Sequence, residues 1–363
     1  IPISRNEPAQ GTVDSRRLWY STLRKYGLAR TKSEMETKGV SALPLVDYYG
    51  LLDIGTPPQR VKMQFDTGSS RFVISMTECP DCSGNAPFNR ALSSTFREGV
   101  APWKIQYGDR SFAAGNIAED KVTLGAISVE NQKLNLVLTE SPNFDDTVDG
   151  VLGLSFGAIS GSTTVFESMT QQGLVDQGIF SFFTGKRSVN GGGEVVFGGL
   201  DMERVEPGNN ITYTSVTEAT HWNIDVQDFT MNGGSFATEK RAASIRSIVD
   251  TGTTLARKFR KVWVAPCKAS YKLGVVVEGK MFSVPYEDLA REYVGFGLCF
   301  SAVQTSSADY LILGDVFLKS NYAVFDQAEK CVGFAPLRTD VKRATTTDSE
   351  DEDTASGRVQ REL

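Results

Sequence analysis

Histidine and cysteine are scarce in this sequence of 363 residues, which has one histidine, His221, and five cysteines. Metal sites built from these residue types need several of them at short spacings, and redox-active cysteines need a strand-to-helix setting that Cys79 lacks. The cysteines comprise one Cys-x-x-Cys pair and three isolated residues: Cys79, Cys82, Cys267, Cys299 and Cys331. We therefore expect no metal ion and no cofactor, and we favour disulfides formed in an oxidising compartment, with one cysteine left over.

Long apolar runs are also missing, because no stretch approaches the ~18 apolar residues that a membrane-spanning helix requires. The chain begins at Ile1, with neither an initiating methionine nor a recognisable signal peptide, so we expect that an upstream segment has been removed. An apolar content of 40% is sufficient for the core of one large or two medium domains. These features predict a globular protein without a membrane span.

Charge is distributed unevenly along the chain. Residues 1–40 carry eight Lys and Arg against four acidic residues, residues 340–363 carry seven acidic residues against four basic ones, and the remainder has a net charge of −7. A basic head on an acidic body indicates an internal docking partner, because opposite charges attract, although a solvated basic tail explains the same distribution. So acidic a body argues against a nucleic-acid partner. The acidic tail has few apolar residues and is predicted to be disordered.

Short apolar runs and 34 glycines favour strands joined by turns over long helices. Residues 48–68 are predicted to form a hairpin around a turn at 55–58, and residues 103–124 a second hairpin with its tip near 108–110. Residues 165–174 have an apolar residue at every third or fourth position, which predicts a short helix. Further strands are expected at 192–200, 211–216 and 221–231.

One short phrase occurs twice in the sequence. Residues 64–70 read QFDTGSS and residues 248–254 read IVDTGTT, so that Asp66 and Asp250 stand 184 residues apart. Two such triplets with matching flanks arise by chance in far less than about one chain in a thousand. A second echo follows each triplet, VDGVLGLSF at 148–156 and YLILGDVF at 310–317, in which an apolar pair precedes a glycine. This shared order indicates a duplication, and the spacing suits two lobes.

These paired motifs closely resemble those of the pepsin-like aspartic proteases. The resemblance extends from about Tyr48 to Leu337 and rests on FDTGSS, VDTGTT, YGDRS, DGVLGLSF and LILGDVFLKSNYAVFD. It implies a mostly β, bilobal pepsin-like aspartic protease fold, with a cleft between two duplicated β lobes and one catalytic aspartate from each. Members of this family are typically made as zymogens with a basic prosegment in the cleft. The head, with SRRLWYSTLRKYGLAR at residues 15–30, resembles such a prosegment.

The expected chemistry explains why the repeated residue is an aspartate. Hydrolysis of a peptide bond by water needs a base for the water and an acid for the carbonyl oxygen, and two adjacent carboxylates that share one proton supply both. The resemblance implies that Asp66 and Asp250 hold the water between them, whereas an ordinary turn at each triplet is the alternative. Four residues are expected to support the pair through close backbone approach or hydroxyl hydrogen bonds: Gly68, Ser69, Gly252 and Thr253.

Further assignments follow from the resemblance. Tyr107 matches the flap tyrosine that closes over the substrate, although an ordinary strand aromatic would fit the same position. A prosegment lysine that reaches the aspartates would be Lys32 or Lys38. The family positions of the disulfides imply that Cys79 pairs with Cys82 and Cys267 with Cys299, which leaves Cys331 without a partner.

The sequence departs from the family pattern mainly in its second half. The first aspartate stands 87 residues before its echo glycine, but the second stands only 64, so the second half is 23 residues shorter. Much of this loss follows VDTGTTL, where the family has a helix beneath the active site. Arg110 replaces a glycine that is common at the flap tip, and Val73 stands where a tryptophan partner of the flap tyrosine is usual.

These observations predict an acid endopeptidase made as a zymogen. We expect a basic prosegment at 1–40, an N-terminal β lobe at 41–205, a shortened C-terminal β lobe at 206–339 and an acidic tail at 340–363. The expected partners are protein or peptide substrates and the chain's own prosegment, and the protein is expected to be a monomer. The sequon Asn210-Ile211-Thr212 fits a protein that is secreted or enters an endolysosomal or vacuolar lumen.

Two other functions are compatible with parts of this pattern. A catalytically weak protein of the same fold could bind peptides in its cleft, which the departures in the second half leave open. A glycosidase with two carboxylates would account for the aspartates, but it would not account for their matching flanks or for the repeated glycine phrases. An assay of peptide cleavage at acid pH, with and without a transition-state inhibitor, separates these alternatives.

Overall fold

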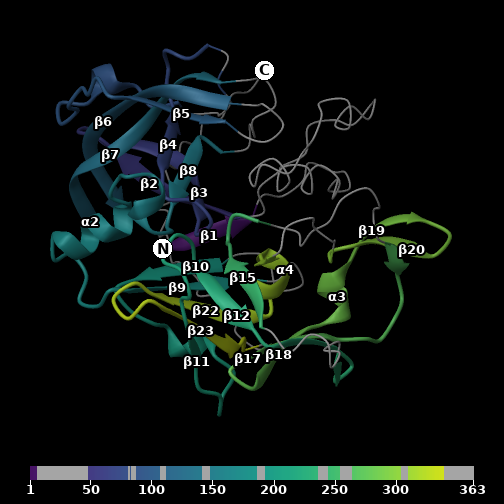
Figure 1. Cartoon of the computed structure of the whole chain (residues 1–363). Coiled ribbons are helices and arrows are strands. Elements are labelled where there is room, and N and C mark those ends of the chain that lie inside the picture. The colour runs from purple at the N-terminus through teal and green to yellow at the C-terminus, as the bar shows by residue number, and fades with distance from the viewer. Residues whose placement is uncertain are drawn as a thin grey trace, which may run out of the picture.

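A computed structural model describes residues 1–5, 48–80, 82, 87–106, 112–140, 148–185, 193–235, 244–253, 264–303 and 310–338. Several sequence-based predictions lie outside these residues: most of the basic head, Tyr107 and Arg110 near the second hairpin tip, the segment 254–263 after the second triplet, and the acidic tail. Within the described part of the chain, no helix is long and apolar enough to cross a membrane. Figure 1 shows two regions rich in strands, one formed by the first half of the chain and one by the second.

The first half folds into consecutive antiparallel and parallel strand pairs. Its strands are β2 (Tyr48–Ile54), β3 (Gln59–Asp66), β4 (Phe72–Ser75), β5 (Pro102–Gln106), β6 (Phe112–Leu124), β7 (Ile127–Glu140) and β8 (Gly150–Gly153). The hairpin predicted at 48–68 is confirmed, since β2 and β3 pair antiparallel with Ile54 opposite Gln59. The second predicted hairpin is confirmed for its strands, since β5 and β6 pair with Gln106 opposite Phe112. Strand β2 also pairs with β6, which closes this lobe.

The predicted helix at 165–174 is confirmed as α2 (Val165–Gln171). A capping box fixes its start, because the Thr164 hydroxyl accepts from the Glu167 amide at 3.2 Å while the Glu167 carboxylate accepts from the Thr164 amide at 2.8 Å. Phe166 and Met169 on its apolar face are fully buried. The helix therefore covers the first lobe with the stripe that its sequence period predicts.

The second half contains shorter strands in several small sheets. The elements are β11 (Thr212–Ser215), β12 (Asn223–Val226), β13 (Asp228–Met231), β14 (Gly234–Ser235), β15 (Ile245–Val249), β16 (Val264–Pro266), β17 (Leu273–Val277), β18 (Lys280–Val284), α3 (Tyr286–Leu289), β19 (Ala290–Gly295), β20 (Leu298–Ser301), β21 (Leu311–Leu313) and α4 (Asp315–Leu318). The strands expected at 211–216 and 221–231 are confirmed as β11 and as β12 with β13, the latter pair divided at Gln227. Separate sheets contain β12-β15-β21, β14-β13-β17-β18 and β16-β20-β19.

One large sheet connects the two halves. Its strand order is β11-β23-β22-β9-β10-β1-β2-β3-β8-β4-β7-β6-β5. The connecting strands are β1 (Pro2–Arg5), β9 (Ile179–Thr184), β10 (Gly193–Phe197), β22 (Asn321–Asp326) and β23 (Cys331–Pro336), and β10 confirms the strand expected at 192–200. Because β1 pairs with β10 on one side and β2 on the other, residues 2–5 of the head belong to this sheet.

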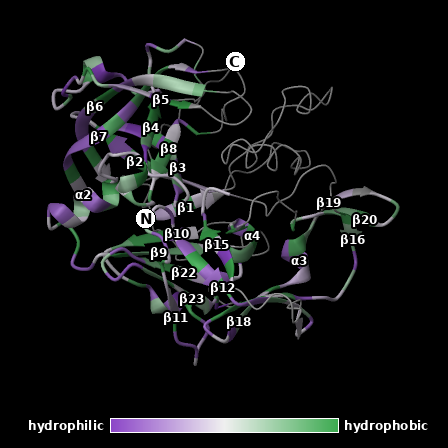
Figure 2. Ribbon diagram, viewed as in Figure 1, coloured by the Kyte–Doolittle hydropathy of each residue, from purple (hydrophilic) through white to green (hydrophobic). Residues whose placement is uncertain are grey.

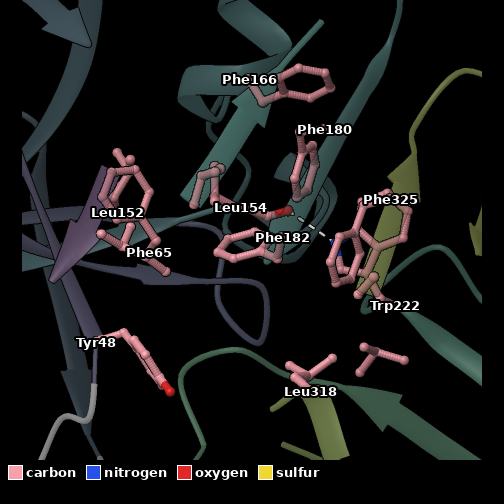
Figure 3. Close-up of a cluster of buried hydrophobic side chains, with 14 of the residues drawn as sticks. Tyr48, Phe65, Leu152, Leu154, Phe166, Phe180, Phe182, Trp222, Leu318 and Phe325 are labelled. Carbon is pink, nitrogen blue, oxygen red and sulfur yellow. Dashed lines mark hydrogen bonds between the residues drawn. The ribbon is translucent and has the colours of Figure 1, made fainter. Parts of the chain in front are cut away.

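An aromatic cluster forms the core where the halves meet. Phe180 on β9 stacks on Phe325 of β22 with ring centroids 5.0 Å apart, and Phe166 meets Phe180 edge to face at 4.8 Å. Trp222 packs into the same cluster and is fully buried. Figure 2 shows hydrophobic residues along the strands of this region, and Figure 3 shows the side chains themselves. Aromatic contacts of this kind hold α2, β9 and β22 in one arrangement.

Candidate active site

The two Asp-Thr-Gly triplets occupy equivalent strand ends. Strand β3 ends at Asp66 and pairs parallel with β8, which places Asp66 opposite Gly153. Strand β15 ends one residue before Asp250 and pairs parallel with β21, which places Val249 opposite Leu313. In each half, the strand that leads into the triplet therefore ends beside the later apolar-apolar-glycine segment, as the repeated order in the sequence suggests.

The echo glycines are required by close backbone approach. A Cβ atom on Gly153 would lie 2.5 Å from the Arg71 amide nitrogen and 2.6 Å from the Ser70 carbonyl carbon. A Cβ atom on Gly314 would lie 2.0 Å from the Thr253 carbonyl oxygen. No side chain fits at either position, which explains why an apolar pair followed by glycine occurs in both halves.

Asp66 is held by its own triplet. The Gly68 amide donates a hydrogen bond to Oδ1 of Asp66 at 2.9 Å, and the Ser69 hydroxyl donates to Oδ2 at 2.6 Å. The Asp66 side chain is only 3% exposed. Donors on both oxygens restrict rotation of the carboxylate and stabilise its negative charge.

Asp250 has a matching environment in the second half. The Gly252 amide donates to its Oδ1 at 2.9 Å, and the Thr253 hydroxyl donates to its Oδ2 in a short hydrogen bond. Asp250 is fully buried. The structure thus brings each aspartate together with the glycine and the hydroxyl residue that the sequence grouped with it.

The two aspartate loops are in direct contact. A Cβ atom placed on Gly68 would lie 2.5 Å from both Cγ and Oδ1 of Asp250, and 2.7 Å from its Oδ2. The backbone of the first triplet therefore reaches the carboxylate of the second, across 184 residues of sequence. Only glycine permits this approach, which gives Gly68 a function beyond the turn it forms.

The middle threonines of the triplets cross-link the loops, a function that the sequence analysis did not assign. The amides of Thr67 and Thr251 each donate to the other residue's hydroxyl at 3.0 Å. The Thr67 hydroxyl donates to the Val249 carbonyl at 2.9 Å, and the Thr251 hydroxyl donates to the Phe65 carbonyl at 2.8 Å. The sequence did contain a signal for this cross-link, because a threonine stands at the centre of both triplets.

Comparison with known proteins identifies the family that shares this arrangement. The family model of the eukaryotic aspartyl proteases matches residues 47–262 and 256–337. This chain belongs to the eukaryotic aspartyl protease family. It is 34% identical to syncephapepsin from Syncephalastrum racemosum over 85% of this chain and 84% of that protein. It is 32% identical to rhizopuspepsin-2 from Rhizopus niveus over 93% and 92% of the two chains, and 32% identical to pepsin A from Rhinolophus ferrumequinum over 85% and 86%.

Membership of this family confirms the main sequence-based predictions. The aspartyl protease has the mostly β, bilobal pepsin-like fold, and it is an aspartic-type endopeptidase, a hydrolase that acts on proteins or peptides. Among the described residues, no group of three or more His, Cys, Asp or Glu side chains is arranged to hold a metal ion.

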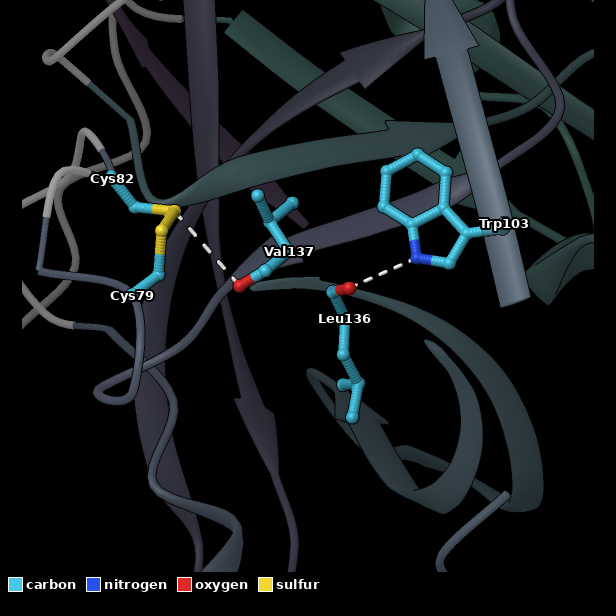
Figure 4. Close-up of a disulfide and its surroundings, with 5 residues drawn as sticks. All are labelled: Cys79, Cys82, Trp103, Leu136 and Val137. Atoms are coloured by element: carbon cyan, nitrogen blue, oxygen red, sulfur yellow. Dashed lines mark hydrogen bonds between the residues drawn. A yellow bond between two sulfur atoms is a disulfide. The ribbon is translucent and has the colours of Figure 1, made fainter. Parts of the chain in front are cut away.

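A disulfide lies beside the hairpin of β5 and β6 in this aspartyl protease. Cys79 and Cys82 are bonded, and the Cys82 sulfur lies 3.9 Å from the Val137 carbonyl oxygen. Because a disulfide sulfur carries no hydrogen, this is a packing contact. Figure 4 shows it next to Trp103, whose indole nitrogen donates to the Leu136 carbonyl at 2.9 Å. Val73, the position at which the resemblance leads us to expect a tryptophan, is half-buried. It packs against the apolar cluster of Trp103, Ala113 and Val137.

A second disulfide joins Cys267 to Cys299, across 32 residues of the second half. Both disulfides pair the cysteines that the family resemblance pairs. Cys331 on β23 remains a free thiol. Burial raises the pKa of the Cys331 thiol to about 11, with a further contribution from the negative charges of Asp326 and Glu329. The thiol therefore stays protonated at acid and neutral pH and is a poor nucleophile.

Proposed function

We propose that Asp66 and Asp250 together activate the water molecule that this endopeptidase uses to cleave peptide bonds. The observation that supports the proposal is the contact between the two loops, in which Gly68 touches the carboxylate of Asp250 while its amide donates to Asp66. Two carboxylates this close do not both ionise readily, because like charges repel at short range. The pair therefore holds one proton between its members, the behaviour for which aspartic proteases are a known example.

The shared proton gives the two carboxylates different functions in one step. The ionised carboxylate accepts a proton from water as the water attacks the carbonyl carbon, and the protonated carboxyl donates to the carbonyl oxygen. The Ser69 hydroxyl donates to Oδ2 of Asp66 and the Thr253 hydroxyl to Oδ2 of Asp250, and these bonds fix the orientation of each carboxylate. Pre-arranged donors need no reorganisation during the reaction, which lowers the barrier.

Replacement of either aspartate tests this proposal. Asp66→Asn and Asp250→Asn each preserve side-chain size but remove one of the two ionisable groups, so we expect peptide cleavage to fall by about 10²- to 10⁴-fold. Asp120→Asn is the matched control, since Asp120 is 1% exposed and accepts from the Thr95 hydroxyl at 2.6 Å, away from both triplets. Substantial turnover by a folded single variant would refute the paired mechanism and favour another site.

We further propose that the chain is a zymogen and that the divisions predicted from the sequence apply, with residues 1–40 as prosegment, 41–205 and 206–339 as lobes, and 340–363 as tail. The net positive charge of the head supports this proposal. So does the pairing of β1 with β2 and β10, because it docks the first residues of the head on the body. The mature enzyme is proposed to act as a monomer on protein or peptide substrates.

The proposed location is outside the cell or in an endolysosomal or vacuolar lumen. Two disulfides support an oxidising route, and Asn210 of the sequon is exposed in the loop before β11. Protein purified from its native host should lose a glycan mass on glycosidase treatment, and Asn210→Gln should remove that difference. An unmodified Asn210 together with reduced Cys267 and Cys299 would contradict this location.

A further inference from the structure

Trp222 hydrogen-bonds to the backbone beside both aspartates. Its indole nitrogen donates to the Leu154 carbonyl at 3.0 Å, and the Leu154 amide donates in turn to the Asp66 carbonyl at 2.8 Å. Its own backbone carbonyl accepts from the Val249 amide at 3.0 Å, and Val249 directly precedes Asp250. One residue in the core is thus linked to the loop of each half.

A second path connects the same segment to the first aspartate. The Ser155 hydroxyl donates to the Thr220 carbonyl at 3.1 Å, and the Ser155 amide donates to the Ser69 carbonyl at 2.9 Å. Ser69 is the residue whose hydroxyl donates to Oδ2 of Asp66. Residues 220–222 are therefore linked to the first aspartate loop at two points, through Leu154 and Ser155.

The indole is held in a fixed orientation. Trp222 is fully buried, and its ring lies 4.5 Å from that of Phe156, 5.1 Å from that of Phe325 and 5.7 Å from that of Phe180, centroid to centroid. Figure 3 shows the indole with Phe180 and Phe325, and with its nitrogen directed at the Leu154 carbonyl. A ring enclosed in this way cannot change rotamer without displacing its neighbours, so the direction of its N–H group is set by the core.

We propose that Trp222 is a positioning residue for the aspartate pair: it sets the relative position of the two loops from the core side. This inference rests on the proposed function of Asp66 and Asp250. A pair that shares one proton needs a short and constant separation, and small displacements of reacting groups cost large factors in rate. The threonine cross-links join the loops directly, whereas Trp222 ties both to the aromatic core and so prevents them from shifting together.

The test compares two substitutions that remove one buried hydrogen-bonding group each. Trp222→Phe keeps an aromatic ring but lacks the N–H donor. Tyr322→Phe is the control, since the Tyr322 hydroxyl donates to the Ser181 hydroxyl at 2.7 Å and accepts from the Asp201 amide at 2.8 Å, without contact to either triplet. For the full chain in the acid cleavage assay, we expect Trp222→Phe to lower kcat by about 10-fold with KM changed by less than about twofold. Tyr322→Phe should lower Tm to a similar extent and leave kcat within about twofold.

A milder variant keeps the proposal testable if Trp222→Phe does not fold. Ser155→Ala removes the hydrogen bond to Thr220 but retains the amide contact to Ser69, and we expect kcat to fall by about threefold. Ser181→Ala, which removes the hydroxyl bond to the Gly199 carbonyl and also the acceptor of the Tyr322 hydroxyl, is its control, and it is the more disruptive of the two changes. Both paths position the same loop, so their effects should not be independent. We expect the double variant Trp222→Phe/Ser155→Ala to lower kcat by less than the product of the two fold-decreases measured for the single variants.

Failure of this inference is distinguishable from failure of the proposed function. If Asp66→Asn still cleaves peptides, the paired mechanism itself is wrong and the positioning inference falls with it. If Asp66→Asn is inactive while Trp222→Phe and Ser155→Ala retain the wild-type kcat at temperatures well below their Tm, only the positioning inference is overturned. A fall in kcat shared equally by Tyr322→Phe would also overturn it, because the loss would then reflect general destabilisation.

Discussion

At the scale of single residues, Gly68 is the glycine of the site that lies against the opposite aspartate. Its amide donates to Asp66, and the space that its missing side chain leaves is filled by the carboxylate of Asp250. The separation of 2.5 Å that a Cβ atom would have from that carboxylate is far below the ordinary carbon contact of about 3.5–4.0 Å. A side chain at this position would therefore push the second aspartate loop away from the first.

We predict that Gly68→Ala lowers kcat by about 100-fold or more, because a displacement of about 1 Å in the aspartate pair is enough for such a loss. Gly199→Ala is the control, since a Cβ atom there meets nothing within 4 Å. Steady-state cleavage of a peptide and thermal unfolding of both variants provide the measurement. If Gly68→Ala cleaved peptides as fast as Gly199→Ala, the close approach of the loops would have no importance for catalysis.

At the scale of elements, the sheet β16-β20-β19 is the part of the second lobe that depends most on a covalent bond. Phe300 is buried, but three apolar residues of the sheet and its turn are exposed: Val264, Tyr293 and Phe296. Exposed apolar side chains add little hydrophobic stabilisation. The disulfide Cys267–Cys299 ties this sheet together across 32 residues, whereas Cys79–Cys82 closes a loop of only three.

Loop length predicts how much each disulfide contributes to stability. By the chain-entropy estimate, Cys267→Ser/Cys299→Ser should lower the free energy of unfolding by about 4 kcal/mol and Cys79→Ser/Cys82→Ser by about 2 kcal/mol. Both pairs are to be changed in a Cys331→Ser background, which prevents thiol exchange. Hydrogen exchange in β20 and β3 reports the two lobes separately, and we expect β20 to be less protected because the second lobe is shortened and has fewer groups to shield its core. An equal loss of unfolding free energy for the two disulfide pairs would contradict the first expectation. Equal hydrogen-exchange protection of β20 and β3 would contradict the second.

At the scale of the whole molecule, the two halves share backbone hydrogen bonds through β1. This strand lies between β10 and β2 in the connecting sheet, and the rest of the basic head follows it directly in sequence. The first residues of the head therefore contribute to the fold, while the charge of the residues after them suits an acid-sensitive contact with the body.

We predict that the full chain is inactive at neutral pH and becomes active on acidification. As the pH falls toward about 4, the ordinary range of carboxyl groups, protonation of body carboxylates weakens their attraction to Arg16, Arg17, Arg24 and Lys25. A chain beginning at Val40 should be active without an acid step, but with a lower Tm because it lacks β1. Peptide cleavage and intact mass, followed together from pH 7 to pH 3, provide the measurement. Cleavage at neutral pH by a chain of unchanged mass would show that the head does not inhibit.

The sequence by itself determined those features that depend on local pattern. The hairpins at 48–68 and 103–124 follow from apolar runs flanking turn residues, and α2 follows from an apolar residue at every third or fourth position. The duplicated triplets and their glycine echoes were sufficient for the fold class and for the candidate aspartates. Each of these signals lies within a few residues of the structure that it predicts, so no knowledge of the chain path was needed.

Only the tertiary structure decided which distant groups meet. Thr67 and Thr251 bind each other across the lobes, Gly68 faces the opposite carboxylate, and Trp222 reaches a carbonyl beside the first loop while its own backbone supports the second. Strand β1 likewise occupies a place between β10 and β2 that its few residues do not specify. These contacts arise because strands far apart in sequence end at the same point in space. The free energy of such pairings depends on the packing of the whole core, which no local window of sequence contains.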